Sequence, residues 1–273
     1  MTPDPASAAP PDLATLLHRG GPAATWGNLG LWTVESQRYA DAAAALATAV
    51  AQAAAVGAGQ RVLCLACGAG DELLALLTHA GVAEGVGVER DPRRATAATR
   101  VLQAAGLSAR GRVITGAALD PGQREAIGDG FDAVLCVDAA YHLSPRMALF
   151  SAAARWLRPG GRLAFTDLVI DPAPRGAATL RAAARLCGVP RADLVPMAAR
   201  AAQLQAAGFA DVQATRLDDA VLGGFSRFVR RQRAVLGRDA WRRAWWPAEV
   251  TAALIGPCRA AGLGYALFGA RRP

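Results

Sequence analysis

The chain has 273 residues, of which 53% are hydrophobic and 19% charged, and its formal net charge is +8. This length predicts one large α/β domain or a domain with a cap, and the hydrophobic fraction is ample for a sizeable core. The most apolar helical stretch, 39–57, is mostly Ala and is interrupted by Asp41 and Gln52. It therefore favours an amphipathic helix over a bilayer span, and no membrane partner is expected.

The N-terminus and the cysteines point to a cytoplasmic protein. Residues 1–12, MTPDPASAAPPD, lack the basic start and the apolar run of a secretory signal, and their composition predicts a disordered tail. The cysteines number five, an odd count, and three of them lie in apolar runs, which is typical of buried reduced thiols. Cys64 and Cys67 form a C-x-x-C, but no second pair completes a zinc site, so no metal is expected.

The positive charge comes from arginine alone, because the sequence contains no lysine. That pattern indicates GC-rich coding bias first and a partner surface second. The stretch from Arg227 to Arg243 has only Asp239 against its arginines. Such a stretch is more often a solvated helix face, or an anchor for an acidic small acceptor, than a nucleic-acid site.

From about residue 60 onward, short apolar runs alternate with longer stretches rich in Ala, Leu and Arg. Runs such as VLCLA and AVLCVD are continuously hydrophobic, as expected of strands buried on both faces of a parallel sheet. The pattern predicts a doubly wound α/β fold with a seven-stranded, mostly parallel sheet. The expected strands are Arg61–Ala66, Gly85–Glu89, Arg112–Thr115, Phe131–Asp138, Arg162–Ile170, Asp211–Leu217 and Gly264–Ala270.

Local signals mark the ends of two helices between these strands. Asp91-Pro92 and Ser144-Pro145 each supply an N-cap followed by proline at the first helical position. The second of these helices carries Phe150, Ala154 and Leu157 on one face and is expected to end at 159–161, Pro-Gly-Gly.

Three helical segments break the alternation. Residues 13–58 precede the main domain, 59–273, and helical insertions are expected at about 171–200 and 218–262. Ligands of doubly wound folds bind at the carboxyl ends of the strands, so we expect these segments to cover that edge as a lid. Simple packing on the sheet is an equally good alternative for each segment. Four tryptophans in these segments are candidates for holding an apolar acceptor: Trp26, Trp32, Trp245 and Trp246.

The segment RVLCLACGAGDE, 61–72, predicts a nucleotide-like ligand. A buried strand runs into a turn of small residues, and a helix then begins at Asp71. Small residues let a ligand approach the backbone, and the free N–H groups of the helix start face it. The dinucleotide pattern G-x-G-x-x-G fails, since Leu73 stands where its third glycine belongs. The candidate contacts are Ala66, Cys67, Gly68 and Gly70.

Glu89 ends the second strand, 21 residues beyond Gly68. An acidic residue at this place can accept hydrogen bonds from both hydroxyls of a ribose. A solvated strand end that pairs with Arg90 or Arg93 is the alternative. The four apolar or glycine residues before Glu89 favour the ribose role.

The chain from about Gly59 to its end resembles class I S-adenosylmethionine methyltransferases. The resemblance is carried by VLCLACGAG, by Glu89, by FDAVLCVDAAYHL, by RWLRPGGRLAFTD, by LQAAGFADV and by GYALFGARRP, in that order. The similarity is greatest to a small-molecule branch that acts on sugars, sterols and natural products. It implies a Rossmann-like fold, S-adenosylmethionine as cofactor, and methyl transfer to O, N or C of a small-molecule acceptor. It further implies a role in the biosynthesis of a specialised metabolite, and a monomer or homodimer. It also implies cofactor contacts from Arg90, Ala117, Ala118 and Asp138.

The chain departs from the family pattern in three places. Cys64 replaces an acid of the first strand that usually helps order the methionine end of the cofactor, and Ala66 replaces the first glycine. Ala66 costs little if its φ is negative. The third motif reads Gly-Ala-Ala at 116–118, with Asp120 displaced from the place of an acid that meets adenine. Two alternatives stay open: an RNA methyltransferase that uses Arg227–Arg243, and a cofactor-binding protein that has lost transfer activity.

The chemistry is expected just past the fourth strand, at 138–142. His142 is the candidate general base, because its ordinary pKa lies near neutrality. Asp167, at the end of the next strand, is expected to orient His142, and Tyr141 to donate a hydrogen bond or to wall the pocket. A capping role for His142 and for Asp167 is the alternative. The stretch DAAY lacks both prolines of the D-P-P-Y found in enzymes that methylate nucleic-acid amines.

Overall fold

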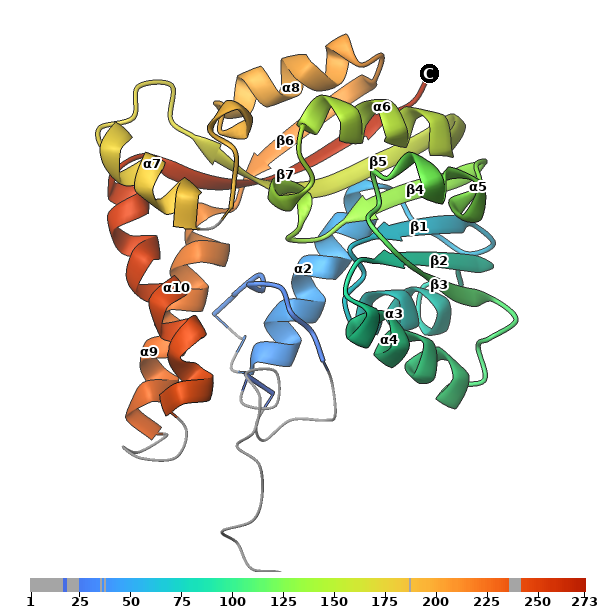
Figure 1. Ribbon diagram of the computed structural model, residues 1–273, viewed down its shortest axis with the longest axis horizontal. Coiled ribbons are helices and arrows are strands. Elements are labelled where there is room, and N and C mark those ends of the chain that lie inside the picture. Colours follow the sequence, from blue (N-terminus) through green and yellow to red (C-terminus); the bar gives the residue numbers. More distant parts are fainter. Residues whose placement is uncertain (1–16, 19–24, 35, 37, 187, 236–241) are drawn as a thin grey trace, which may run out of the picture.

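The computed structural model describes residues 17–18, 25–34, 36, 38–186, 188–235 and 242–273. Its centre is a seven-stranded sheet with the order β3-β2-β1-β4-β5-β7-β6 (Figure 1). Neighbouring strands are parallel except at β7, which runs antiparallel to both β5 and β6. The predicted doubly wound, mostly parallel sheet is confirmed. The strands are β1 (Arg61–Leu65), β2 (Glu84–Glu89), β3 (Gly111–Thr115), β4 (Phe131–Cys136), β5 (Leu157–Ile170), β6 (Ala210–Arg216) and β7 (Leu263–Arg271).

Helices cover both faces of the sheet (Figure 1). On one face lie α2 (Tyr39–Ala53), α3 (Asp71–Thr78) and α4 (Pro92–Ala104), which pack onto inward side chains such as Cys64 and Leu135. On the other lie α5 (Arg124–Ile127), α6 (Arg146–Trp156) and α8 (Met197–Ala206), which pack onto Leu63, Leu65 and Phe165. Because both faces are buried, the central strands are hydrophobic at successive positions.

The two predicted helix starts differ in outcome. Asp91 caps α4 as predicted, since its Oδ1 accepts a hydrogen bond from the Arg93 backbone N–H at 2.9 Å. The prediction for Ser144 is wrong, because Pro145 occupies the N-cap position of α6 and makes no side-chain cap.

The predicted end of α6 is also wrong. The helix ends at Trp156, and residues 159–161 belong to β5. The Gly160 N–H donates to the Arg272 carbonyl at 2.9 Å, and the Arg272 N–H donates to the Gly161 carbonyl at 2.8 Å. These long-range bonds tie the two glycines to Arg272, with Gly160 at a φ of +80°, which a local helix-stop signal does not reveal.

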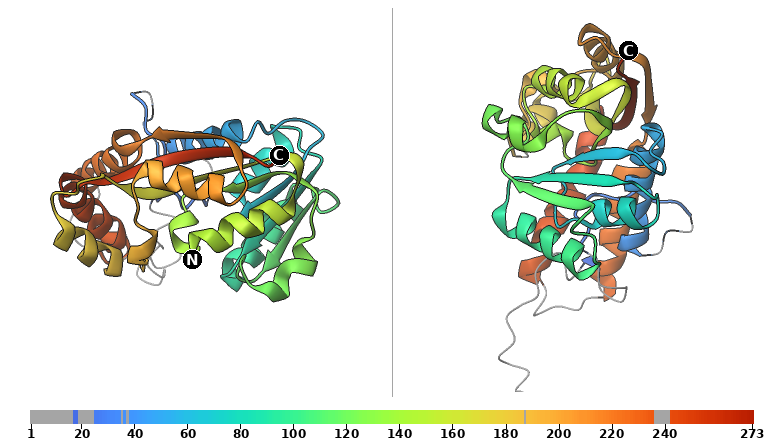
Figure 2. Two further views of the ribbon diagram at one scale, coloured as in Figure 1. Left: turned by 90° about the horizontal axis from the view of Figure 1, so that it is seen from above. Right: turned by 90° about the vertical axis from the view of Figure 1, so that its right-hand side faces the viewer.

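The late insertions are helical, as predicted. Figure 1 and the left view of Figure 2 show α7 (Ala177–Leu186), α9 (Gly224–Val235) and α10 (Arg242–Ala260) gathered at one end of the sheet. A π-helix, Asp219–Gly223, leads into α9. None of the helices in the described ranges combines the length and the hydropathy that crossing a membrane requires. The predicted tail, 1–12, lies outside the described residues, and the division into lid and domain stays a prediction.

The N-terminal segment is helical only in part. Residues 25–34 form no helix, and α2 begins at Tyr39, so the predicted helical segment 13–58 is wrong over 25–34. Gly30 has a φ of +78°, and a Cβ there would lie 2.9 Å from the Ala42 Cβ. The Leu31 N–H donates to the Ala42 carbonyl and the Trp32 N–H to the Ala220 carbonyl, so this backbone bonds to other elements instead of to itself. We call residues 25–32 the strap.

Candidate active site

A cavity of about 550 Å³ lies where β1, β2, β3 and β4 end, within the size range of small-molecule sites. Four loops after these strands and the N-terminal half of the strap form its wall. The lining residues are Thr25, Trp26, Gly27, Asn28, Ala66, Cys67, Gly68, Ala69, Asp71, Glu72, Val88, Glu89, Arg90, Arg94, Gly116, Ala117, Ala118, Leu119, Val137, Asp138, Ala139, Tyr141, His142, Leu143 and Ser144. The cavity therefore lies at the carboxyl ends of the strands, the edge of the sheet that the sequence predicts for ligand binding.

The turn between β1 and α3 forms one wall of the cavity. A Cβ added at Gly68 would meet nothing within 4 Å, so its backbone is open to a ligand. Gly70 does not line the cavity: with a φ of +95° it precedes α3, and a Cβ there would lie 2.9 Å from the Ala98 Cβ. Its predicted contact with a cofactor is thus replaced by a structural role, the close packing of α3 on α4.

Ala66 adopts the left-handed region, with a φ of +54°. Ala66 would replace the family's first glycine at little cost only if its φ were negative, and it is not. Left-handed backbone at a residue with a Cβ costs on the order of 1–2 kcal/mol. Ala66 lines the cavity, so this strain lies at the site itself.

Glu89 connects two loops of the cavity. Its side chain is 5% exposed, its Oε2 accepts a hydrogen bond from the Gly68 N–H at 3.0 Å, and its Oε1 accepts one from the Asp91 N–H at 2.9 Å. A carboxylate offers about four lone-pair sites, so each oxygen keeps acceptor capacity for a ligand hydroxyl. Within the described residues Glu89 makes no ion pair with Arg90 or Arg93, contrary to the alternative of a solvated strand end.

The third-motif residues Ala117 and Ala118 line the cavity beside Arg90. Asp120 does not line it, because its Oδ1 accepts the Gly122 N–H at 2.9 Å and caps the short 3₁₀ turn Pro121–Gln123. This side of the cavity therefore offers small side chains and backbone to a flat ring, with no carboxylate from this motif.

Asp138 is a buried junction at the end of β4. Its Oδ1 accepts hydrogen bonds from the Tyr265 hydroxyl at 2.7 Å and the Tyr141 hydroxyl at 3.0 Å, and its Oδ2 accepts one from the Leu29 N–H at 2.6 Å. Burial raises the pKa of Asp138 to about 6, although all three donors act in the opposite direction. Asp138 lines the cavity as predicted, and it also fixes the strap there.

The strap crosses the cavity between two anchoring carboxylates. Besides the bond from Leu29 to Asp138, the Thr25 N–H donates to Asp71 Oδ1 at 3.1 Å. Asn28 holds the middle of the strap, because its Nδ2 donates to the Ala43 carbonyl of α2 at 3.1 Å. These contacts hold the strap backbone between α3 and the end of β4, where residues 25–28 form part of the cavity wall.

Tyr141 and His142 lie together on the 3₁₀ turn Ala140–His142, and both line the cavity. Their rings meet edge to face with centroids 4.4 Å apart. Burial lowers the pKa of His142, and the charges of Arg90 and Arg146 lower it further. Neutral imidazole, the form that accepts a proton, is thereby favoured at neutral pH.

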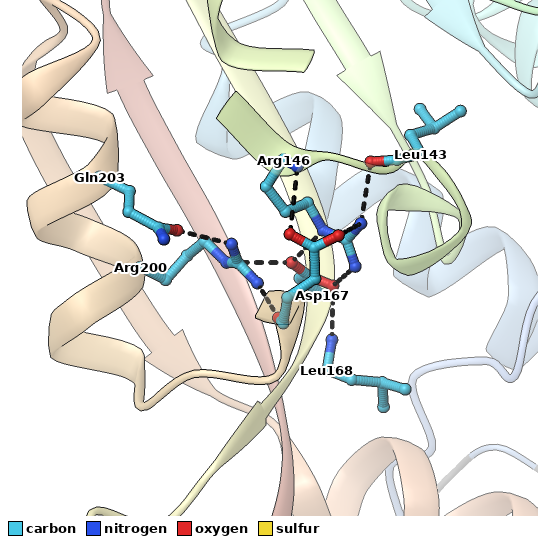
Figure 3. A network of polar contacts seen from close by, with 7 residues as sticks. Leu143, Arg146, Asp167, Leu168, Arg200 and Gln203 are labelled. Carbon is cyan, nitrogen blue, oxygen red and sulfur yellow. Dashed lines mark hydrogen bonds and ion pairs between the residues drawn. The ribbon is translucent and has the colours of Figure 1, made fainter. Parts of the chain in front are cut away.

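The predicted pairing of Asp167 with His142 is not formed. Asp167 is buried in the interior of β5 and does not line the cavity. Arg146 donates two hydrogen bonds to Asp167, from Nε to Oδ2 at 2.9 Å and from Nη2 to Oδ1 at 3.1 Å. Arg200 Nε lies 3.1 Å from Oδ2 of the same carboxylate (Figure 3). The Arg200 contact is an ion pair without hydrogen-bond alignment.

A second carboxylate, Asp193, accepts the Arg146 N–H at 3.2 Å and balances the charge of this network. Both oxygens of Asp167 are thus occupied by a buried structural cluster of two anions and two cations. Asp167 also makes one local contact of the capping kind, because its Oδ1 accepts a hydrogen bond from the Leu168 N–H at 2.9 Å.

Of the four candidate tryptophans, only Trp26 lines the cavity. Trp32 and Trp245 are core residues that pack with Phe228, and Trp245 is 2% exposed. Trp246, in contrast, is 64% exposed. The cavity therefore gives no support to acceptor contacts by these three: Trp32 and Trp245 belong to the core cluster that joins α2, α9 and α10, and Trp246 lies at the surface. The arginines of the 227–243 stretch that belong to α9 are exposed, namely Arg227, Arg230, Arg231 and Arg233, and Arg227 pairs with Asp219.

Sequence reasoning missed Glu72 and Asp71, which follow Gly70 at the start of α3 and line the cavity. Two adjacent acids after a ligand-binding turn are a visible signal, but their side chains diverge. Asp71 accepts a hydrogen bond from the Thr25 N–H of the strap, whereas Glu72 points inward and is buried.

Comparisons with known proteins agree with this geometry. A profile of the methyltransferase domain family matches residues 62–161, the stretch that holds the Gly68 turn, Glu89 and His142. The chain is 30% identical over 203 residues to erythromycin 3''-O-methyltransferase of Saccharopolyspora erythraea, a span of 71% of this chain and 65% of that protein. It is 32% identical over 156 residues to 27-O-demethylrifamycin SV methyltransferase of Amycolatopsis mediterranei, 55% of each protein. The matches thus span less than two thirds of either relative.

Among solved structures, the chain is similar to a protein described as a putative sarcosine dimethylglycine methyltransferase from Galdieria sulphuraria. The TM-score is 0.73 at 16% identity, over 90% of this chain and 92% of the other. At this identity the similarity shows the fold, which is the Rossmann-like arrangement that the sequence predicts.

Proposed function

We propose that this chain, which belongs to the class I methyltransferases, transfers the methyl group of S-adenosylmethionine to a hydroxyl of a small natural product. The observation that carries the proposal is the cavity itself. It brings the open Gly68 backbone, the Glu89 carboxylate and the His142 imidazole to one space under the strap. The names of the two curated relatives, erythromycin 3''-O-methyltransferase and 27-O-demethylrifamycin SV methyltransferase, support a hydroxyl acceptor.

The residues present fit the donor. Gly68 leaves room for a ligand against its backbone, and Glu89 keeps acceptor capacity for ribose hydroxyls. The small side chains of Ala117 and Ala118 leave space for a flat base beside Arg90. When bound, the donor supplies a methyl group already activated on a sulfonium.

The protein's own part is to align and to move a proton. Alignment of two reactants in a closed site supplies on the order of 7–11 kcal/mol of the barrier. A hydroxyl acceptor must also lose its proton, and His142 is the neutral base that lines the cavity. The strap limits the access of water to the reacting groups.

The RNA alternative is less well supported. It needs the arginines of 227–243 to face the reacting centre, but no described residue of α9 lines the cavity. Arg227 is engaged by Asp219, and Arg233 Nε lies 3.7 Å from Glu249 Oε1. We infer a solvated helix face for this stretch. We also infer a cytoplasmic enzyme of specialised biosynthesis, because Cys64, Cys67 and Cys136 are buried free thiols.

The function is tested with a donor that carries a carbon-13 methyl group. Wild-type protein is incubated with macrolides and ansamycins that have a free hydroxyl, with bulk RNA, and with cell extract. We expect products heavier by one labelled methyl among the small molecules, with the label on oxygen by NMR. Label in RNA would instead support the alternative, and no label anywhere with intact donor binding would indicate lost transfer activity.

The first prediction concerns donor binding by Glu89. Glu89→Ala removes charge-assisted hydrogen bonds worth about 1.5–3 kcal/mol. We expect the affinity for S-adenosylhomocysteine to fall about ten- to a hundredfold in calorimetry. Glu125→Ala, at an exposed residue of α5, is the matched control and is expected to bind like the wild type. A folded Glu89→Ala protein with unchanged affinity would remove Glu89 from the donor site.

A further inference from the structure

Glu72 is a buried carboxylate without a partner. It lies in the first turn of α3, lines the cavity and is 8% exposed. Its Oε1 has no hydrogen-bond partner among the described residues. Burial of an unsatisfied carboxyl is costly, and burial raises the pKa of Glu72 to about 8.

The surroundings of Glu72 offer no compensation from the protein. The charge of Glu72 raises the pKa of three buried thiols, those of Cys64, Cys67 and Cys136. No arginine lowers the pKa of Glu72 itself. The other buried carboxylates differ. Glu89 accepts two backbone N–H groups, and Asp167 and Asp193 share Arg146. Glu72 alone among these faces the cavity with free acceptor capacity and no donor.

The position of Glu72 matches one end of the donor. If Glu89 at the end of β2 holds the ribose, the base lies toward the loop after β3, where Ala117 and Ala118 are. The amino-acid end must then extend the other way, across the end of β1 toward β4. Glu72 lies on that side, beside Cys64 of β1.

We propose that Glu72 binds the ammonium group of the donor's amino-acid end by a charge-assisted hydrogen bond. The inference rests on the proposed function. It supplies from α3 the carboxylate that strand β1 lacks at Cys64. A cation with N–H donors is the ligand that satisfies a buried, unpaired carboxyl, since it provides both the charge and the missing hydrogen bond.

Binding then changes the protonation of Glu72. With a pKa of about 8, the carboxyl is mostly protonated at pH 7 in the ligand-free protein. An adjacent ammonium favours the ionised form, so binding at pH 7 releases close to one proton, and the release fades above about pH 8.

The experiment compares two ligands by calorimetry. S-adenosylhomocysteine carries the ammonium, whereas 5′-methylthioadenosine has the same nucleoside and lacks the amino-acid end. Glu72→Gln keeps the shape of the side chain and is expected to bind S-adenosylhomocysteine about ten- to a hundredfold more weakly, with unchanged affinity for methylthioadenosine. Titrations in buffers of different ionisation enthalpy should show proton release for the wild type and for Glu125→Gln, and none for Glu72→Gln.

The outcomes separate this inference from the proposed function. Wild-type binding of S-adenosylhomocysteine with equal losses for both ligands in Glu72→Gln, or with no loss, overturns the role of Glu72 and leaves the function standing. Absence of binding by the wild type overturns both. Thermal unfolding of ligand-free Glu72→Gln checks folding, and we expect stability at least equal to the wild type, because the substitution replaces a buried carboxyl by a neutral amide.

Discussion

His142→Ala is expected to lower kcat on the identified acceptor by roughly 10²–10⁴-fold, with little change in donor affinity. The reason is that an oxygen acceptor must lose a proton, and His142 is a cavity residue whose pKa burial and two arginines lower. His79→Ala, at an exposed histidine beyond the end of α3, is the matched control and should retain wild-type turnover.

The pH profile adds an independent readout. A base acts in its neutral form, so wild-type activity should fall as pH drops through the His142 pKa, which lies below the ordinary value of 6.5. His142→Ala should lose this limb of the profile. A variant with a wild-type profile and only a few-fold loss of rate would show that proximity alone carries the reaction and that His142 is no base.

Asp167→Asn is expected to reduce the free energy of unfolding by about 3–5 kcal/mol, the effect typical of breaking a buried ion pair. Burial raises the pKa of Asp167 and lowers that of Arg200, so these charges already bear a desolvation penalty. Removal of one anion leaves Arg146 and Arg200 facing Asp193 alone (Figure 3). Urea unfolding measures the loss.

Two further variants make this prediction specific. Asp211→Asn breaks an exposed ion pair with Arg271 and should change stability little. Asp167→Asn combined with Arg200→Gln removes one charge of each sign and should be less destabilised than the single variant. Equal stability of Asp167→Asn and the wild type would show that the cluster is not a structural centre.

Local sequence signals predict the sheet and two parts of the cavity wall, the Gly68 turn and Glu89. Continuous apolar runs locate central strands such as β1 and β4, because both faces of the sheet are covered there. Glu89 and the Gly68 turn are predictable because a strand end and a run of small residues are visible in a few consecutive residues. These same residues form the surface that a ligand would contact. Both line the cavity.

Side-chain partners were not predictable in the same way. Asp167 stands at the end of an apolar run and looks like a base-orienting acid, but its partners come from α6 and α8, which the sequence places far away. Trp245 and Trp32 were read as ligand contacts, yet an aromatic ring outside the βα alternation serves equally well to attach a helical layer to the domain. Only tertiary packing distinguishes these roles.

The departures at Cys64 and Ala66 have different physical consequences. Ala66 places backbone strain at the site, with a φ of +54°. Cys64, which replaces the family's carboxylate, has a neighbour in Glu72 in the first turn of α3, whose buried position could not be read from an Asp-Glu pair at a helix start.

We propose that one cavity under the strap holds the donor and presents it to the acceptor beside His142. A crystal structure with S-adenosylhomocysteine tests it most directly. We expect both ribose hydroxyls within hydrogen-bond distance of Glu89, the base against Ala117 and Ala118, and the sulfur directed toward Tyr141 and His142. A ligand bound outside this cavity, or bound in it with its ribose away from Glu89, would contradict the account.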